Sequence, residues 1–174
     1  MADAIHFLKT RARQLHRQAA AREPGALARV GQLDELRNLE QDALAEAVRR
    51  RHCLAVVARE VGFRGWPHAA AIIGGATGGD FGTLLYPPGA DAHWNIWSAS
   101  YDEARSIRHA HGGYLLAYKT HFFIVDRYFI ETIGLDPEDA DWALIGRDWV
   151  RPGRADARQR FYGKLIIRRF AAAA

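Results

Sequence analysis

A glycine-rich run at residues 74–79, Gly-Gly-Ala-Thr-Gly-Gly, divides the chain into two stretches that we expect to fold around separate cores. Segments of this composition behave as flexible linkers. Sixteen of the nineteen aromatic residues follow residue 80, so the second stretch can build a dense core of its own. We therefore expect a module at residues 1–75, a linker at residues 76–80 and an aromatic-rich unit at residues 81–174.

The first stretch carries the apolar spacing of helices. Apolar residues recur every three to four positions at Ile5, Leu8, Ala12, Leu15 and Ala19. A second periodic run lies between residues 27 and 44, and shorter runs follow at 50–61 and 67–73. These patterns predict a module made of helices alone.

The second stretch mixes strand and helix patterns. Runs at residues 81–86, 93–98, 114–117 and 121–125 favour strands, because they alternate or are rich in β-branched and aromatic residues. Capping and glycine signals predict helices at residues 100–111, 127–133, 136–146 and 155–170. The order of these elements predicts an α+β fold, a small antiparallel sheet with helices packed on one face and a basic helix at the C-terminal end.

The segment from Leu54 to Pro67 contains the pattern A-R-x-x-G-F-x-x-W, which closes one helix and opens the next. It resembles the small helical module of glyoxalase-related bacterial proteins, and similar segments that precede some ankyrin-repeat arrays. The resemblance implies a helical fold and brings no catalytic residues. It departs from the family at Gly65, where serine is usual before the tryptophan. The run that begins G-G-Y-L-L-A-Y-K looks like that of an uncharacterised bacterial family.

Composition excludes several classes of protein. Apolar residues make up 49% of the chain and charged residues 25%, which is typical of globular domains and not of disordered chains. No apolar stretch approaches the roughly 20 residues that span a bilayer, and the N-terminal residues lack the apolar core of a signal peptide. Cys53 is the only cysteine, so no intrachain disulfide can form. We expect a cytoplasmic protein without a membrane contact.

The net charge of +4 is unevenly distributed. Residues 1–29 and 151–174 are basic, whereas residues 80–150 hold five basic and eleven acidic side chains. The basic ends could pair with the acidic middle of the chain or across a dimer. Alternatively, they could contact phosphates of a nucleic acid, where each Lys or Arg displaces a counterion. The first interpretation is favoured.

Candidate catalytic chemistry centres on His93, Lys119, His121 and Asp126, which could form the site of a small hydrolase or a metal-dependent enzyme. The chain contains neither H-E-x-x-H nor C-x-x-C, and the glycine-rich run lacks the G-K-[ST] of a phosphate-binding loop. The acidic pairs Asp102/Glu103 and Asp139/Asp141 lie at the start of predicted helices, where their negative charge compensates the helix dipole. The sequence therefore predicts no metal site and no cofactor.

A non-catalytic binding or accessory protein explains these features best, with a protein partner or a second copy of the chain favoured over nucleic acid. The candidate binding residues are aromatic or basic: Trp97, Tyr118, Lys119, Arg151, Arg154 and Arg158. The enzyme centred on the four residues above remains the alternative.

Overall fold

The computed structural model describes residues 3–90 and 93–172, which divide into two compact units. One unit comprises residues 5–70, and the other comprises residues 71–174 together with the first four residues of the chain. The division falls inside helix α5 (Trp66–Ile73), between Ala70 and Ala71. The expected boundaries at residues 75 and 81 remain a prediction for proteolysis to test.

The unit of residues 5–70 is helical in the part of the chain that the structure describes. Its helices are α1 (Ala4–Ala20), α2 (Pro24–Val30), α3 (Gln41–Ala47), α4 (Arg50–Glu60) and the first part of α5. The apolar stripe of α1 is buried at Leu8, Ala12, Leu15 and Ala19, as its spacing predicts. Arg29 joins α2 to α4 through two hydrogen bonds of 2.8 and 2.9 Å to the carboxylate of Glu60.

The second unit contains a three-stranded antiparallel sheet in the order β1-β3-β2. Its strands are β1 (Asn95–Ser98), β2 (Tyr114–Tyr118) and β3 (His121–Val125). The helices are α6 (Tyr101–His111), α7 (Arg127–Thr132), α8 (Asp141–Leu144) and α9 (Ala155–Ala172). These elements confirm the α+β fold with a small antiparallel sheet.

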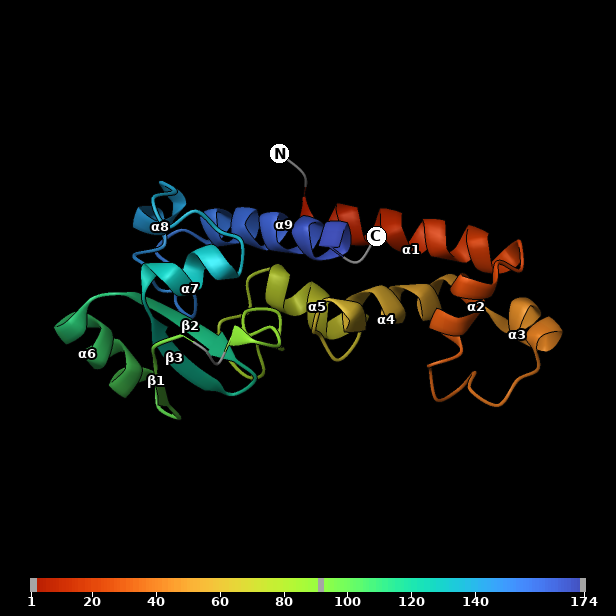
Figure 1. Ribbon diagram of the computed structural model, residues 1–174, viewed down its shortest axis with the longest axis horizontal. Coiled ribbons are helices and arrows are strands. Elements are labelled where there is room, and N and C mark those ends of the chain that lie inside the picture. Colours follow the sequence, from red (N-terminus) through yellow and green to blue (C-terminus); the bar gives the residue numbers. More distant parts are fainter. Residues whose placement is uncertain (1–2, 91–92, 173–174) are drawn as a thin grey trace. The chain divides into compact units, whose positions relative to one another are not determined.

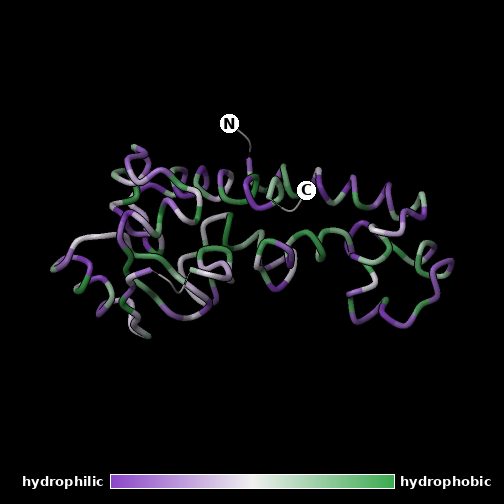
Figure 2. The backbone as a smooth tube through the Cα atoms, viewed as in Figure 1, coloured by the Kyte–Doolittle hydropathy of each residue, from purple (hydrophilic) through white to green (hydrophobic). Residues whose placement is uncertain are grey.

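Helices cover both faces of this sheet, whereas the sequence led us to expect them on one. Successive strand residues point to opposite faces. Phe122 of β3 contacts Tyr101 of α6, with ring centroids 5.8 Å apart, while the neighbouring Phe123 contacts Phe129 of α7 at 5.6 Å. Figure 1 shows α6 and α7 on different sides of the strands. Figure 2 shows β2 mainly in the green of hydrophobic residues and α6 mainly in the purple of hydrophilic ones.

The strand expected at residues 81–86 is absent, because local contacts bend this segment. Gly82 has a φ of +75°, a left-handed conformation that ends an extended run. The Asp80 carboxylate accepts a hydrogen bond from the Gly82 N–H at 2.7 Å, and the Tyr86 N–H donates to the Thr83 carbonyl at 3.1 Å. Two backbone hydrogen bonds, from the Phe81 N–H to the Lys119 carbonyl and from the Lys119 N–H to the Gly82 carbonyl, join this segment to the β2–β3 turn.

The helix expected from residue 136 begins later, at Asp141. Asp136 accepts a hydrogen bond from the Glu138 N–H at 2.9 Å, and Asp139 accepts one from the Asp141 N–H at 3.0 Å. Each carboxylate therefore caps a separate turn rather than the first turn of one helix. The helix expected at residues 155–170 is confirmed as α9, with Phe161, Leu165 and Phe170 all buried.

Candidate functional site

The four residues of the enzyme alternative lie at two ends of β3. Asn95 pairs with Val125, so His93 and Asp126 lie near the C-terminal end of β3. Tyr118 pairs with His121, so Lys119 and His121 lie at its N-terminal end. The five-residue separation of His121 and Asp126 corresponds to roughly 16 Å along a strand. The structure therefore does not bring the four side chains together.

Three of these four residues make local contacts instead, and the fourth is exposed. His93 Nε2 lies 2.9 Å from Thr132 Oγ1, and Asp126 caps α7 by accepting a hydrogen bond from the Phe129 N–H at 3.0 Å. Lys119 occupies the β2–β3 turn with a φ of +51°, and its Nζ lies 5.3 Å from the centre of the Tyr118 ring. His121 is exposed at the start of β3.

A metal site and a reactive cysteine are the other kinds of site that the residue types would allow. Among the described residues, no group of three or more His, Cys, Asp or Glu side chains could hold a metal ion. Cys53 is fully buried in α4, and burial raises the pKa of its thiol to about 11. The reactive form of a cysteine is the thiolate, so Cys53 is an inert core residue at neutral pH.

Two of the candidate binding residues lie in one aromatic cluster. Trp97 and Tyr118 have ring centroids 5.9 Å apart, and Tyr86 lies 5.1 and 5.6 Å from them, respectively. Trp97 also stacks on Phe123 and is 39% exposed. Beside the cluster is a hollow of about 390 Å³ whose lining includes Tyr86, Tyr118 and Arg169.

The three candidate binding arginines have different surroundings. Arg158 is 0% exposed, and its guanidinium donates hydrogen bonds to the carbonyls of Trp149, Val150 and Ala76. It holds the fold together and cannot contact a partner, so that prediction is wrong. Arg154 forms an ion pair with Asp156 at 2.9 Å. Arg151 lines a cleft.

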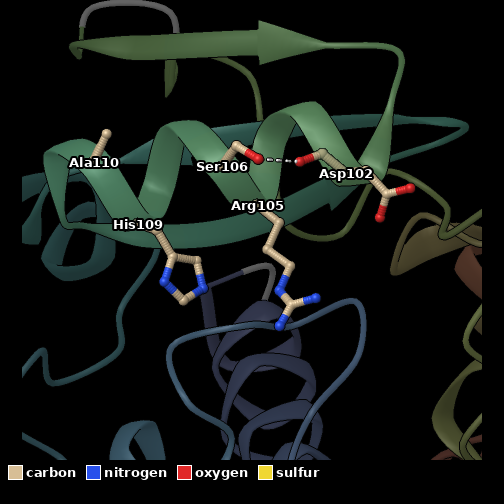
Figure 3. A pocket seen from close by; sticks show the side chains of 5 residues that line it. All are labelled: Asp102, Arg105, Ser106, His109 and Ala110. Atoms are coloured by element: carbon tan, nitrogen blue, oxygen red, sulfur yellow. Dashed lines mark hydrogen bonds between the residues drawn. The ribbon is translucent and has the colours of Figure 1, made fainter.

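This cleft, of about 360 Å³, lies between α6 and the segment 145–153. Hereafter it is called the α6 cleft, and the residues that line it are Tyr101, Arg105, Arg108, His109, Ile145, Gly146, Asp148, Arg151 and Gly153. Four of them belong to α6 and share one of its faces, because residues three, four or seven positions apart on a helix lie together. Figure 3 shows Arg105 and His109 extending from the same side of α6.

The sequence before α6 fixes where this helix begins. Ser100 accepts a hydrogen bond from the Glu103 N–H at 3.4 Å, which is one half of the predicted capping box. The other half is altered: the Glu103 carboxylate contacts the Ser98 hydroxyl, and the Ser100 N–H donates to that hydroxyl at 2.9 Å. Since Ser98 ends β1, this contact ties the start of α6 to the sheet.

The wall formed by residues 145–153 is organised by Asp148. One carboxylate oxygen accepts hydrogen bonds from the Val150 and Arg151 N–H groups, both at 2.9 Å, and the other accepts the Tyr101 hydroxyl proton at 2.6 Å. Arg151 lies over the Tyr101 ring, with the guanidinium carbon 4.1 Å from the ring centre. Asp148 therefore joins the two walls of the cleft and positions Arg151.

The α6 cleft is electropositive. Within residues 3–90 and 93–172, Arg105, Arg108 and Arg151 form no ion pair with a carboxylate, whereas Arg160 pairs with Asp141 and Lys164 with Asp139. The ion pairs of Arg160 with Asp141 and of Lys164 with Asp139 confirm that part of the basic C-terminal stretch folds back on the acidic middle of the chain. The arginines of the cleft remain available to a ligand.

Burial affects two side chains of this cleft, Arg108 and Tyr101. The Arg108 Nε–H is buried, and no described residue accepts a hydrogen bond from it. Buried polar groups are normally paired, and the buried Arg158 Nε–H is likewise without an acceptor among the described residues. Burial, with the hydrogen bond to Asp148, raises the pKa of Tyr101 to about 12. Tyr101 is therefore a neutral structural donor and not a base.

Sequence reasoning identified only Arg151 in this cleft. The face of α6 could have been found from the spacing of Tyr101, Arg105, Arg108 and His109 in a helix that was correctly predicted. Its partner Asp148 lies 47 residues away in the chain, and no local pattern connects them.

Comparison with known proteins gives no further guide to this site, because no family model, curated protein or solved structure matches the chain.

Proposed function

We propose that this is a non-catalytic binding or accessory protein that holds an anionic group of a partner protein in the α6 cleft. The observation that carries the proposal is the set of three arginines, Arg105, Arg108 and Arg151, that line one cleft without a carboxylate partner among the described residues. Arginine forks bind oxyanions through charge-assisted, bidentate hydrogen bonds.

A protein partner is favoured over nucleic acid because the basic surface is interrupted. Nucleic-acid backbones bind to extended basic stripes. On α9, Arg160 and Lys164 are already paired with acidic residues, and Arg158 is buried. Arg105, Arg108 and Arg151 line one bounded cleft instead, which suits a single anionic group.

The test is the binding of a fluorescent peptide rich in glutamate and aspartate, measured by anisotropy. Arg105→Gln and Arg151→Gln should each weaken binding by about tenfold, the loss expected when a charge-assisted hydrogen bond is removed. Arg154→Gln is the matched control, since Arg154 already pairs with Asp156. Equal affinities of all variants would contradict the proposal. Tighter binding to random duplex DNA, with a steep salt dependence, would favour the nucleic-acid alternative.

We further propose a docking or dimerising role for the unit of residues 5–70, and a cytoplasmic location for the protein. The resemblance of residues 54–67 to the helical module of glyoxalase-related bacterial proteins supports a docking or dimerising role for this unit. A fully buried, unreactive Cys53 suits a reducing cytoplasm. None of the helices in the described residues is long and apolar enough to cross a membrane. Light scattering of the full chain and of a chain lacking residues 5–70 would test the dimerising role.

A further inference from the structure

We propose that the group held in the α6 cleft is a phosphate monoester on a side chain of the partner protein. This inference rests on the proposed function of the same cleft and names the chemistry of its ligand. It follows from the charge of the lining residues, from the arginine donors that lack acceptors, and from the space beside the cleft.

The charge of the lining matches a dianion. Arg105, Arg108 and Arg151 contribute three positive charges and Asp148 one negative charge, which leaves two positive charges when His109 is neutral. A phosphate monoester carries about −1.5 to −2 at neutral pH, whereas the carboxylate of a glutamate or aspartate carries a single charge. A carboxylate would leave the cleft with excess positive charge.

Asp148 does not offset the arginines by direct pairing. Both of its oxygens are occupied, one by Tyr101 and the other by the N–H groups of Val150 and Arg151. The side chain of Arg151 lies instead over the Tyr101 ring. Apart from a 3.5 Å contact between Arg108 Nη2 and His109 Nε2, no hydrogen bond to a described residue occupies the guanidinium donors of the cleft, which pair with no carboxylate among the described residues.

The number of donors favours a tetrahedral oxyanion. Each guanidinium presents several N–H donors in a planar fork, and Arg108 has in addition a buried Nε–H without an acceptor in the described residues. A phosphate monoester offers three terminal oxygens as strong acceptors, directed away from one another. A carboxylate offers two oxygens in one plane, so it matches the donors of three arginines from two separate segments less well than a tetrahedral phosphate does.

The surface beside the cleft leaves room for the chain that carries the phosphate. A shallow hollow of about 730 Å³ runs along α6 and is lined by Asp102, Arg105, Ser106, His109 and Ala110 (Figure 3). It shares Arg105 and His109 with the α6 cleft. Ser106 is turned to its own helix, where its hydroxyl donates to the Asp102 carbonyl at 2.9 Å. A peptide backbone can therefore pass along α6 on either side of a phosphate seated in the cleft.

The experiment compares four probes by calorimetry with the full chain: blocked tripeptides with phosphoserine, glutamate or serine at the centre, and inorganic phosphate. The phosphoserine peptide should bind at least about tenfold more tightly than the glutamate peptide, and the serine peptide should not bind. The phosphoserine peptide should also bind more tightly than inorganic phosphate.

Variants locate the site. Arg105→Gln should weaken phosphoserine binding about tenfold, and Arg108→Lys, which keeps the charge but removes the planar fork, should weaken it by a similar factor. Arg154→Gln should bind as the wild type does. Because Arg105 is exposed, its variant should fold normally, so a loss of binding reports on the site rather than on stability.

The outcomes separate the two proposals. Equal binding of the glutamate and phosphoserine peptides would overturn the phosphate inference and leave the anion-binding function standing. Equal or tighter binding of inorganic phosphate would overturn the assignment to a partner protein and indicate a free phosphate ligand. Absence of binding by every probe, or binding unchanged in both cleft variants, would overturn the inference together with the proposed function.

Discussion

Asp148 is the residue on which the shape of the α6 cleft depends, because it accepts hydrogen bonds from both walls. Replacing it with alanine leaves a tyrosine hydroxyl and two backbone N–H groups without their acceptor. We expect Asp148→Ala to lower the free energy of unfolding by about 2–4 kcal/mol, since each unsatisfied buried group costs about 1–3 kcal/mol. Urea denaturation measures this change.

The companion variant Tyr101→Phe removes only the single hydrogen bond between the walls. It should cost about 1 kcal/mol, because the ring, its contact with Phe122 and its stacking under Arg151 are all retained. Wild-type stability in Asp148→Ala would show that Asp148 does not hold the walls together.

Residue type alone could not assign the basic side chains to their roles. Arg151, Arg154 and Arg158 lie within eight residues of one another in the same basic stretch. One lines the cleft, one forms a local ion pair and one is buried against backbone carbonyls. Their environments depend on segments distant in the chain, such as Ala76 for Arg158 and Tyr101 for Arg151. The sequence therefore singled out these arginines but could not show which of them lines the cleft.

At the scale of single elements, the N-terminus of α4 contains a titratable cap. His52 Nδ1 accepts a hydrogen bond from the Arg49 N–H at 3.0 Å, and His52 Nε2 lies 3.2 Å from both the Glu35 carboxylate and Arg51 Nε. Burial, with the nearby Arg51 and Arg49, lowers the pKa of His52 below its ordinary value of 6.5, although Glu35 opposes this shift. Protonation of Nδ1 would remove the acceptor that caps α4.

The pH dependence of the protein's stability follows from the lowered pKa of His52. Between the folded and unfolded pKa values the unfolded chain binds a proton that the folded chain does not, so stability rises with pH. The contribution of His52 is complete above the unfolded value of 6.5 and is lost as the pH falls through the folded pKa.

We expect the free energy of unfolding to fall as the pH drops below the ordinary histidine pKa of 6.5, and to fall less in His52→Gln, because glutamine at this position accepts the same hydrogen bond without titrating. Denaturation at several pH values measures the difference. Identical pH profiles for the two proteins would contradict this account of the cap.

Elements with clear local signals were the ones that the sequence predicted. Ser100 caps α6, Gly112 follows its last residue, and Asp126 caps α7, so these helices lie close to where the pattern placed them. The hairpin of β2 and β3 turns at Lys119 as expected. The errors at residues 81–86 and 136–140 have one cause: side-chain carboxylates at Asp80, Asp136 and Asp139 bond to nearby N–H groups and form turns that apolar patterning does not show.

At the scale of the whole molecule, the glycine-rich run at residues 74–79 contains a hydrogen-bonded residue, Ala76, followed by an exposed part, residues 77–79. Ala76 is held, since its N–H donates to the Ala71 carbonyl at 3.0 Å and its carbonyl accepts a hydrogen bond from buried Arg158 at 3.2 Å. Residues 77–79 are exposed. We therefore expect limited proteolysis to cut first at residues 77–79, because exposed backbone with few contacts fits a protease active site.

Mass spectrometry of the first fragments identifies the cut. Two persistent fragments would support independently stable units, with Arg158→Lys accelerating the cleavage because lysine cannot donate to all three carbonyls. First cleavage within α4 or α9 would show that the run is better protected than the helices beside it.

The arginine Nε–H groups report directly on whether the α6 cleft holds an anionic group of another molecule, as we propose. Heteronuclear NMR of these groups, recorded while the glutamate- and aspartate-rich peptide is added, follows each guanidinium separately once single Arg→Lys variants have assigned the signals. We expect the signals of Arg105, Arg108 and Arg151 to move together and saturate at one equivalent, with the largest change at Arg108, while that of Arg154 stays in place. Movement confined to arginines outside the cleft, or no movement at saturating peptide, would contradict binding in the cleft.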